Sequence, residues 1–191
     1  MYLGINLYEK NLFTAALIGL DREVYLINHF WKEGLYWFLE HSKIKTATLN
    51  INFKEKNSGI KFRYLTELMN VLLENFEFEQ LEIKGCVKDK RLVSITDSDL
   101  FFEQAVRKQL LPIETREGVE QRIYTLPKSG IVIKENLFSS DIEKLRSEVN
   151  AVVAAFTSLS IHTGVYSIKD IEGIEVIIPQ YRYIPKSERK L

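Results

Sequence analysis

The chain opens with M-Y-L-G-I-N-L, in which apolar side chains recur at every second position. In an extended strand this spacing places Leu3, Ile5 and Leu7 on one face and Gly4 and Asn6 on the other. Asn6 therefore brings a polar side chain to the carboxyl end of an otherwise apolar strand. Ligands of open α/β sheets bind at that end of the strands. We interpret the segment as the central strand of such a sheet, with Asn6 as a candidate site residue.

The segments that follow predict a mixed sheet. Apolar runs at residues 12–19 and 23–30 are joined by short polar turns, so the first three strands form an antiparallel meander. The period then changes, which indicates a helix over residues 31–42. Alternation returns at residues 46–53. Because this strand follows a helix, we expect it to pair in parallel with the first strand through a right-handed crossover.

The second half of the chain predicts further helices and short strands. Apolar side chains at helical spacing indicate helices at residues 64–76 and 142–163, the latter ended by Gly164. Residues 78–96 leave two alternatives open, a hairpin about residues 88–90 or a strand followed by a loop. The remaining expectations are a helix at 100–111 capped by Asp97 or Ser98, a mobile charged segment at 116–128, a buried strand at 131–133 and an apolar segment at 176–179.

Length and composition narrow the class of protein. The 191 residues suit one domain over residues 1–191, with a tail at 180–191 that we expect to fray. Basic and acidic residues number 26 each, so no global charge attracts nucleic acid or a membrane. The single cysteine, Cys86, excludes an internal disulfide and indicates a reduced thiol. Without an apolar run of ~20 residues, the expectation is a soluble cytoplasmic protein that has no membrane partner.

Several segments resemble one family within the RNase-H-like superfold. The succession of a meander, a helix, a parallel strand, further α/β elements and a long C-terminal helix is similar to that fold. The specific resemblance is to the domain of unknown function 429 family, described as predicted RNase-H-like nucleases, and it implies a divergent member of that family. The matching segments are G-I-N-L at 4–7, L-N-I-N at 49–52, E-V-N-A at 148–151, A-A-F-T at 154–157, and Gly164, Asp170, E-G at 172–173 and V-I-I-P at 176–179.

The resemblance implies an α/β fold with an RNase-H-like mixed sheet, an antiparallel N-terminal meander plus parallel strands, and flanking helices. It also implies that Asn6, Asn52 and Asn150 occupy positions where the family carries acids. Two-metal hydrolysis of phosphodiesters needs carboxylates, because their charge offsets the repulsion between two divalent cations. An asparagine carbonyl brings an oxygen ligand but no charge. Three such replacements predict a degenerate site without tight metal binding and without a resident cofactor.

The nearest acids that could compensate for the missing carboxylates are Glu135, Asp141 and Glu148, and of these we take Glu135 and Glu148 as candidate site residues. For each of them the alternative is a solvated face or a charge near a helix N-terminus. For each asparagine the alternative is a local hydrogen bond to the backbone. If the compensating acids complete a site, Mg²⁺ or Mn²⁺ is the expected cofactor.

Other residues give weaker signals. The three histidines, His29, His41 and His162, show no spacing typical of metal ligands, and the sequence supports no Ser-His-Asp arrangement. We expect the aromatic side chains of Trp31, Tyr36 and Trp37 to pack in the core, with base stacking or a partner surface as alternatives.

Three hypotheses follow from these patterns. The first is a pseudo-nuclease that keeps a binding or structural role, with nucleic acid as its implied partner. The second is an active metal-dependent nuclease that uses non-standard acids. The third is a dimeric interaction module without enzymatic activity.

Overall fold

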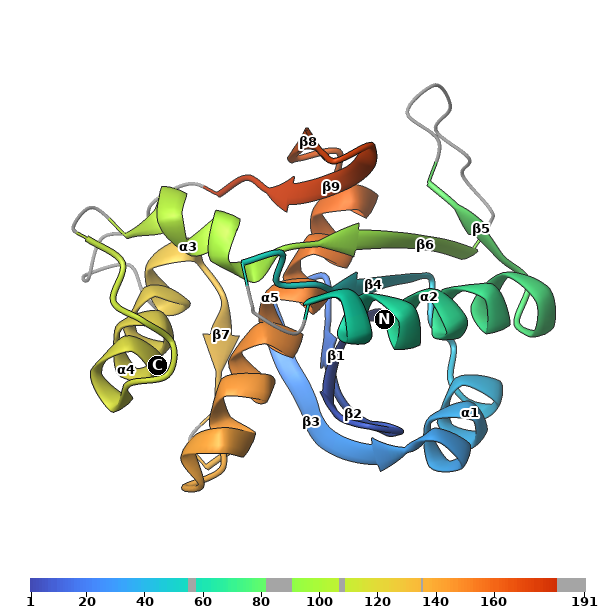
Figure 1. Cartoon of the computed structure of the whole chain (residues 1–191), viewed down its shortest axis with the longest axis horizontal. Helices are drawn as coiled ribbons and strands as arrows, with labels where there is room; N and C mark the ends of the chain where they lie inside the picture. The colour runs from blue at the N-terminus through green and yellow to red at the C-terminus, as the bar shows by residue number, and fades with distance from the viewer. Residues whose placement is uncertain (55–57, 82–90, 107–108, 135, 182–191) are drawn as a thin grey trace.

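A computed structural model gives the arrangement of residues 1–54, 58–81, 91–106, 109–134 and 136–181 (Figure 1). Within these ranges a seven-stranded mixed sheet has the order β5-β6-β4-β1-β2-β3-β7, and a separate hairpin is formed by β8 and β9. The strands of the large sheet are β1 (Tyr2–Glu9), β2 (Leu12–Ile18), β3 (Glu23–Trp31), β4 (Thr46–Asn50), β5 (Phe78–Gln80), β6 (Arg91–Thr96) and β7 (Val132–Ile133). The hairpin strands are β8 (Tyr166–Ile171) and β9 (Ile174–Pro179).

The expected pairing of the strands is confirmed. Strands β1, β2 and β3 form an antiparallel meander, and β4 lies parallel to β1. Strands β6 and β5 continue the parallel half of the sheet, while β7 pairs in parallel with β3 at the other edge. The fold is therefore α/β, with a mixed sheet that combines the meander and the parallel strands.

Helices cover both faces of the sheet (Figure 1). The helices are α1 (Lys32–His41), α2 (Ser58–Asn75), α3 (Ser98–Ala105), α4 (Arg116–Thr125) and α5 (Ile142–Thr163), with a 3-10 turn at Pro127–Ser129. One core holds Leu3 and Ile5 of β1 together with Leu35 of α1 and Leu68 of α2. The other core is built around α5, and includes side chains of α3, α4 and β9. The alternation in β1 assigns its odd positions to the first core and its even positions to the α5 face.

Gly4 sets how closely α5 approaches the sheet. A Cβ atom at this position would lie 2.0 Å from the carbonyl oxygen of Ala151 and 2.1 Å from the backbone nitrogen of Ala155. The glycine in β1 and the alanines of α5 therefore let the two backbones touch. This contact brings the first turns of α5 over the carboxyl end of β1.

Most predicted elements are confirmed with shifted ends. Helix α2 begins at Ser58, earlier than expected, whereas α3 ends at Ala105, before the expected Leu111. Asp97 is the N-cap of α3 and Asp141 that of α5, and Gly164 ends α5 in the left-handed conformation. The turn at residues 88–90, which belongs to one of the two alternatives for residues 78–96, lies outside the described residues, as do Cys86 and the tail beyond residue 181. The described strands on either side, β5 and β6, are parallel.

The apolar segment expected at 176–179 is confirmed: it is buried and forms the second strand of a hairpin, whose turn places Gly173 at a positive φ. Two other expectations were wrong. Residues 116–125, expected to be mobile, form α4, which Thr115 caps by accepting a hydrogen bond from the backbone of Gly118. Trp31 and Trp37, expected in the core, are 62% and 63% exposed, whereas Tyr36 packs against the first core. The local sequence does not show which surfaces of an element its neighbours will cover, and both errors have this cause.

Candidate functional site

Polar side chains form a row across the middle of the sheet, on the face covered by α5. Asn6 on β1 lies opposite Asn50 of β4 on one side and Thr14 of β2 on the other. Thr14 in turn lies opposite His29 of β3. Because directly paired residues of neighbouring strands project to the same face, the pairing register aligns these four side chains. The row continues into α5 through Ser147.

The asparagines of this row bond to each other. Asn50 Nδ2 donates to Asn6 Oδ1 at 2.9 Å, and Asn50 Oδ1 accepts from the backbone N–H of Ser98 at 2.9 Å. Asn6 Nδ2 donates to Ser147 Oγ at 2.7 Å and to the carbonyl of Leu7 at 3.3 Å. Asn6 and Asn50 are 8% and 2% exposed. A buried amide group needs hydrogen-bond partners if its burial is not to lower the stability of the fold. For Asn6 and Asn50 all of these partners are neutral groups.

A second branch runs from Ser147 to a carboxylate. Ser147 Oγ lies 2.6 Å from Thr14 Oγ1, which lies 3.0 Å from His29 Nδ1. His29 Nε2 lies 3.0 Å from Glu148 Oε1, and Glu148 Oε2 accepts from the backbone N–H of Ser139 at 2.7 Å. Thr14 is fully buried and Glu148 is 4% exposed. The branch is a continuous sequence of polar contacts between the cleft described below and β3.

Asn150 lies one turn along α5 from Ser147 and faces the same way, since residues three apart share a helix face. Its Oδ1 accepts from Ser98 Oγ at 2.9 Å. The residue is 6% exposed, and it lies at the edge of the row, where it also lines the cleft.

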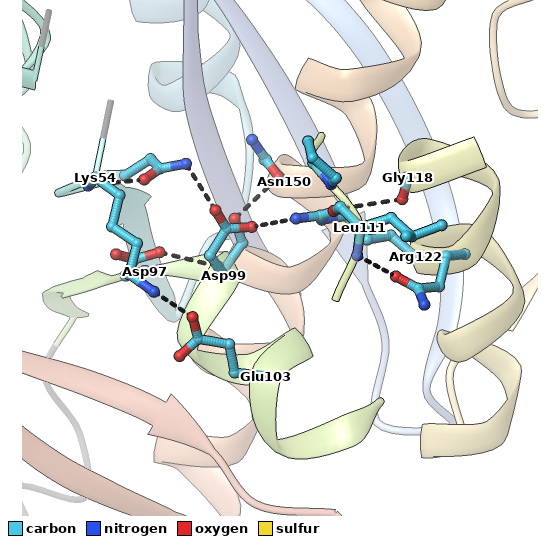
Figure 2. A network of polar contacts seen from close by, with 12 residues as sticks. Lys54, Asp97, Asp99, Glu103, Leu111, Gly118, Arg122 and Asn150 are labelled. Atoms are coloured by element: carbon cyan, nitrogen blue, oxygen red, sulfur yellow. Dashed lines mark hydrogen bonds and ion pairs between the residues drawn. The ribbon is translucent and has the colours of Figure 1, made fainter. Parts of the chain in front are cut away.

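Asn52 makes its side-chain hydrogen bonds in a neighbouring cluster around Asp99, which Figure 2 shows together with Asn150. It lies beyond the end of β4, where its Nδ2 donates to Asp99 Oδ2 at 2.9 Å and its Oδ1 accepts from the backbone N–H of Lys54 at 3.0 Å. Asp99 Oδ1 accepts from Arg122 of α4 at 2.8 Å, and Arg122 is 2% exposed. Lys54 also forms an ion pair with Glu103. The cluster joins β4, α3 and α4.

Asp97 is the most perturbed carboxyl group of this region. Burial raises its pKa to about 6, although hydrogen bonds from the backbone of Asp99 and Phe53 act in the opposite direction. The carboxyl caps α3 by accepting from the Asp99 N–H at 2.9 Å. The position of this carboxyl group indicates that it stabilises the N-terminus of α3 and does not act in the cleft described below.

A cleft of about 230 Å³ opens beside the row. Its polar floor contains Asn6, Ser147 and Asn150, and the loop before α4 closes one side. The other lining residues are Leu7, Tyr8, Lys61, Ile113, Glu114, Glu143 and Arg146. Arg146 donates to Glu143 at 2.8 Å, so the lining holds two cationic and two anionic side chains. The carboxyl end of β1 is thus an open, polar and nearly charge-balanced site.

The structure brings two of the three predicted asparagines into one network. Asn6 and Asn150 are connected through Asn50 and Ser98, whereas Asn52 bonds to Asp99 outside that network. Asn50 and Asn52 share a face by strand alternation, but β4 ends at Asn50. Sequence alone therefore does not decide which of them lies beside Asn6.

Of the two compensating acids, Glu148 lies in the network at its far end, bonded to His29, and Glu135 lies outside the described residues. Asp141 is the N-cap of α5, where its carboxylate accepts from Glu143 and Lys144. In the described part of the chain, no three His, Cys, Asp or Glu side chains gather into a group that could hold a metal ion.

Sequence reasoning missed Thr14, His29 and Ser147 as site residues. The meander gave a usable signal, because two short turns fix which residues of β2 and β3 lie opposite Asn6. The contact between Thr14 and Ser147 spans 133 positions and depends on how α5 crosses the sheet. Local pattern contains no information on that crossing.

Comparison with known proteins found no match to this chain. No family model, curated protein or solved structure matches the chain. In the ranges that the structure describes, no helix has the length and apolar character needed to cross a membrane.

Proposed function

We propose that this protein is a divergent RNase-H-like domain that has lost metal-dependent hydrolysis and retains its cleft for binding. The observation that carries the proposal is the hydrogen bond between Asn50 Nδ2 and Asn6 Oδ1, at the carboxyl ends of two parallel strands. A pair of carboxylates at this place would repel each other unless cations lay between them. The two amides instead form a hydrogen bond with each other, so these side chains need no cation between them.

The fold order supports the class. A three-stranded meander, a helix, parallel strands and a long helix packed over the first strand follow each other in the way expected of RNase-H-like domains. Asn150 on α5 lies near the ends of β1 and β4, linked to Asn50 through Ser98. This meeting of three segments distant in the sequence supports the proposal that the site derives from one that held metal ions.

Metal titration tests the proposal. Calorimetry of the wild-type chain with Mn²⁺ and Mg²⁺ should show no saturable binding at micromolar to millimolar metal, and no cleavage of single- or double-stranded oligonucleotides. The control is the double variant Asn6→Asp/Asn150→Asp, which restores two charges and should gain Mn²⁺ binding, because carboxylates offset the cation charge. A circular dichroism spectrum checks that the variant folds.

Saturable metal binding and cleavage by the wild-type chain would instead support the alternative of an active nuclease with non-standard acids. The variant Glu148→Gln identifies that alternative, since it should abolish such cleavage if Glu148 is a ligand. Binding of oligonucleotides without cleavage, weakening as salt rises, would identify nucleic acid as the partner.

The exposed tryptophans favour a second candidate, an interaction surface used in a homodimer. Trp31 at the end of β3 and Trp37 on α1 are both more than half exposed. Trp37 stacks on His41 with ring centroids 4.5 Å apart. Sedimentation of the wild-type chain and of Trp31→Ser/Trp37→Ser tests this candidate: dimerisation that the double substitution abolishes supports it, and a monomer at high concentration contradicts it.

A further inference from the structure

A groove of about 520 Å³ lies at the β5–β6 end of the large sheet and shares no lining residue with the cleft. Helix α2 forms one wall of the groove, and the β8–β9 hairpin forms the other (Figure 1). Strand β5 pairs with β6 as far as Val93, and among the described strands none continues on that side of β6. The groove lies beside this part of β6. Its volume falls within the roughly 300–1,000 Å³ of small-molecule sites.

Most of the surface of this groove is apolar. On the helical wall, Phe62, Met69 and Leu73 recur at helical spacing and therefore share one face of α2. Ile95 of β6 lies between the two walls, and Ile177 of β9, which is 3% exposed, lines the groove from the hairpin. A ligand with an apolar body would release water from these side chains, which favours binding.

Two carboxylates line the groove from the hairpin. Asp170 of β8 and Glu175 of β9 are direct cross-strand partners, so their side chains project to the same face. Strand alternation places Ile177 on that face too, whereas Val176 and Ile178 pack into the core around α5. Like charges that lie directly opposite each other in an antiparallel pair destabilise it. The groove face of the hairpin therefore carries a repulsion that a bound cation would offset.

No described residue that lines the groove is a lysine or an arginine. Asp170 Oδ1 accepts a hydrogen bond from the backbone N–H of Gly173 at 3.0 Å, but within the part of the chain that the structure describes neither carboxylate forms an ion pair. Lys169 is next to Asp170 in the chain, yet alternation directs its side chain to the opposite face of the hairpin. Among the described side chains, the groove is thus apolar and acidic without a compensating cation.

An organic cation suits these surroundings better than a metal ion. Ca²⁺ takes about six to eight oxygen ligands, whereas the side chains around the two carboxylates are mainly apolar. In the described ranges no three His, Cys, Asp or Glu side chains gather as a metal site. An anionic ligand would add to the repulsion between Asp170 and Glu175, and a neutral ligand would leave it unchanged.

We propose that this groove binds a small organic amine, with the ammonium group at Asp170 and Glu175 and the apolar body against α2 and β6. An alkylammonium group has three N–H donors, so one such group serves both carboxylates. The apolar wall holds the rest of the molecule and excludes water from its surface. The inference goes beyond the proposed function and does not depend on it, because the groove and the cleft have different lining residues.

An NMR titration with 2-phenylethylamine tests the inference. The full chain is labelled at its Ile and Met methyl groups and kept at pH 7 in EDTA, with ionic strength held constant by sodium chloride. The methyl signals of Met69, Ile95 and Ile177 should shift to saturation at millimolar amine. The neutral analogue 2-phenylethanol should bind about fivefold more weakly, because it forms no ion pair. Unshifted signals with the amine, or equal affinity for the alcohol, would overturn the proposal.

Charge-removing variants identify the groups that hold the amine. Asp170→Asn/Glu175→Gln keeps the shape of both exposed side chains and should lower the affinity for the amine about fivefold, to that of the alcohol. Glu172→Gln is the matched control, since it removes a charge from the same hairpin turn outside the groove lining and should keep the wild-type affinity. Wild-type affinity in the double variant overturns the role of the carboxylates. Tighter binding of Ca²⁺ than of the amine at these signals, measured without EDTA, overturns the assignment of an organic ligand.

Discussion

At the scale of single residues, neutral side chains that bond to one another form the polar row at the ends of two parallel strands. Asn6 and Asn50 occupy neighbouring strand ends, and their mutual hydrogen bond requires no cation. The nearest buried acids are used elsewhere: Glu148 accepts from His29 and from Ser139, while Asp99 pairs with Arg122. The buried polar atoms of this region are therefore arranged to satisfy one another, which is the condition for burying them at low cost.

Asp97 allows a prediction on pH dependence. Its folded-state pKa of about 6 lies above the ordinary 3.8, because burial disfavours the charged form. The folded chain therefore binds the proton more tightly than the unfolded chain, and stability from this group is present below pH 4 and lost as pH rises through 6. Relative to Asp97→Asn, the wild-type free energy of unfolding should fall by about 2 to 3 kcal/mol between pH 4 and pH 7.

Urea unfolding of both chains across this pH range checks the prediction. Asn70→Asp, which places a carboxyl group at an exposed position of α2, should show no comparable loss of stability. Parallel pH profiles for the wild-type chain and Asp97→Asn would contradict the raised pKa.

At the scale of elements, close packing of α5 against β1 positions the cleft. The backbone contact at Gly4 brings Ser147 within reach of Asn6, so the position of the helix and the polar row depend on one another. A second contact joins α3 and α4, where Arg122 donates to Asp99 and to the carbonyls of Leu111 and Gly118 (Figure 2). These contacts hold two sides of the candidate site.

Gly4→Ala should destabilise the chain by about 3 kcal/mol or more, because the new Cβ overlaps the backbone of α5 and the helix must move away. The matched control is Gly59→Ala in the first turn of α2, where nothing lies within 4 Å of the added Cβ. Replacing that glycine should stabilise the helix by about 0.5 to 1 kcal/mol. Chemical denaturation measures both, and equal effects of the two substitutions would refute the proposed role of Gly4.

Arg122→Met should cost about 3 to 5 kcal/mol, since it leaves the Asp99 carboxylate without its buried cationic partner. The exposed pair of Arg116 with Glu120 on the same helix provides the control, and Arg116→Met should cost less than about 1 kcal/mol. Thermal unfolding of both variants checks the difference. A mild effect of Arg122→Met would show that α4 does not depend on the ion pair.

At the scale of the whole molecule, the two hydrophobic cores lie on opposite faces of the sheet, with β1 between them. Helices α1 and α2 cover one face, α5 covers the other, and the β8–β9 hairpin forms a separate sheet that packs on α5 and β6. Backbone hydrogen bonds of β1 and α5 are consequently shielded from water on all sides. Those of the hairpin and of the short edge strands are less protected.

Native-state hydrogen exchange should therefore be slowest in β1, β4 and α5, where exchange requires global unfolding at a cost of about 5 to 15 kcal/mol. Exchange in β8 and β7 should proceed by local opening at several kcal/mol less. Mass spectrometry of peptides from the described segments measures the order. Slower exchange in β8 than in β1 would contradict the two-core description.

Local sequence determined much of this architecture. Alternating apolar residues defined β1 and the meander, helical spacing defined α2 and α5, and capping residues such as Asp97 and Asp141 marked helix starts. These features follow from the period of each element and from short-range hydrogen bonds. They also sufficed to predict that β4 pairs with β1 and that Asn6 lies at the carboxyl end of the first strand.

Only the tertiary structure decided which side chains meet. The choice of Asn50 over Asn52 as the partner of Asn6 depends on where β4 ends, and the contact of Thr14 with Ser147 depends on how α5 crosses the sheet. His29 and Glu148 are 119 positions apart, yet their side chains form one pair. Such contacts arise from the packing of whole elements against each other, which period and propensity along the chain do not encode.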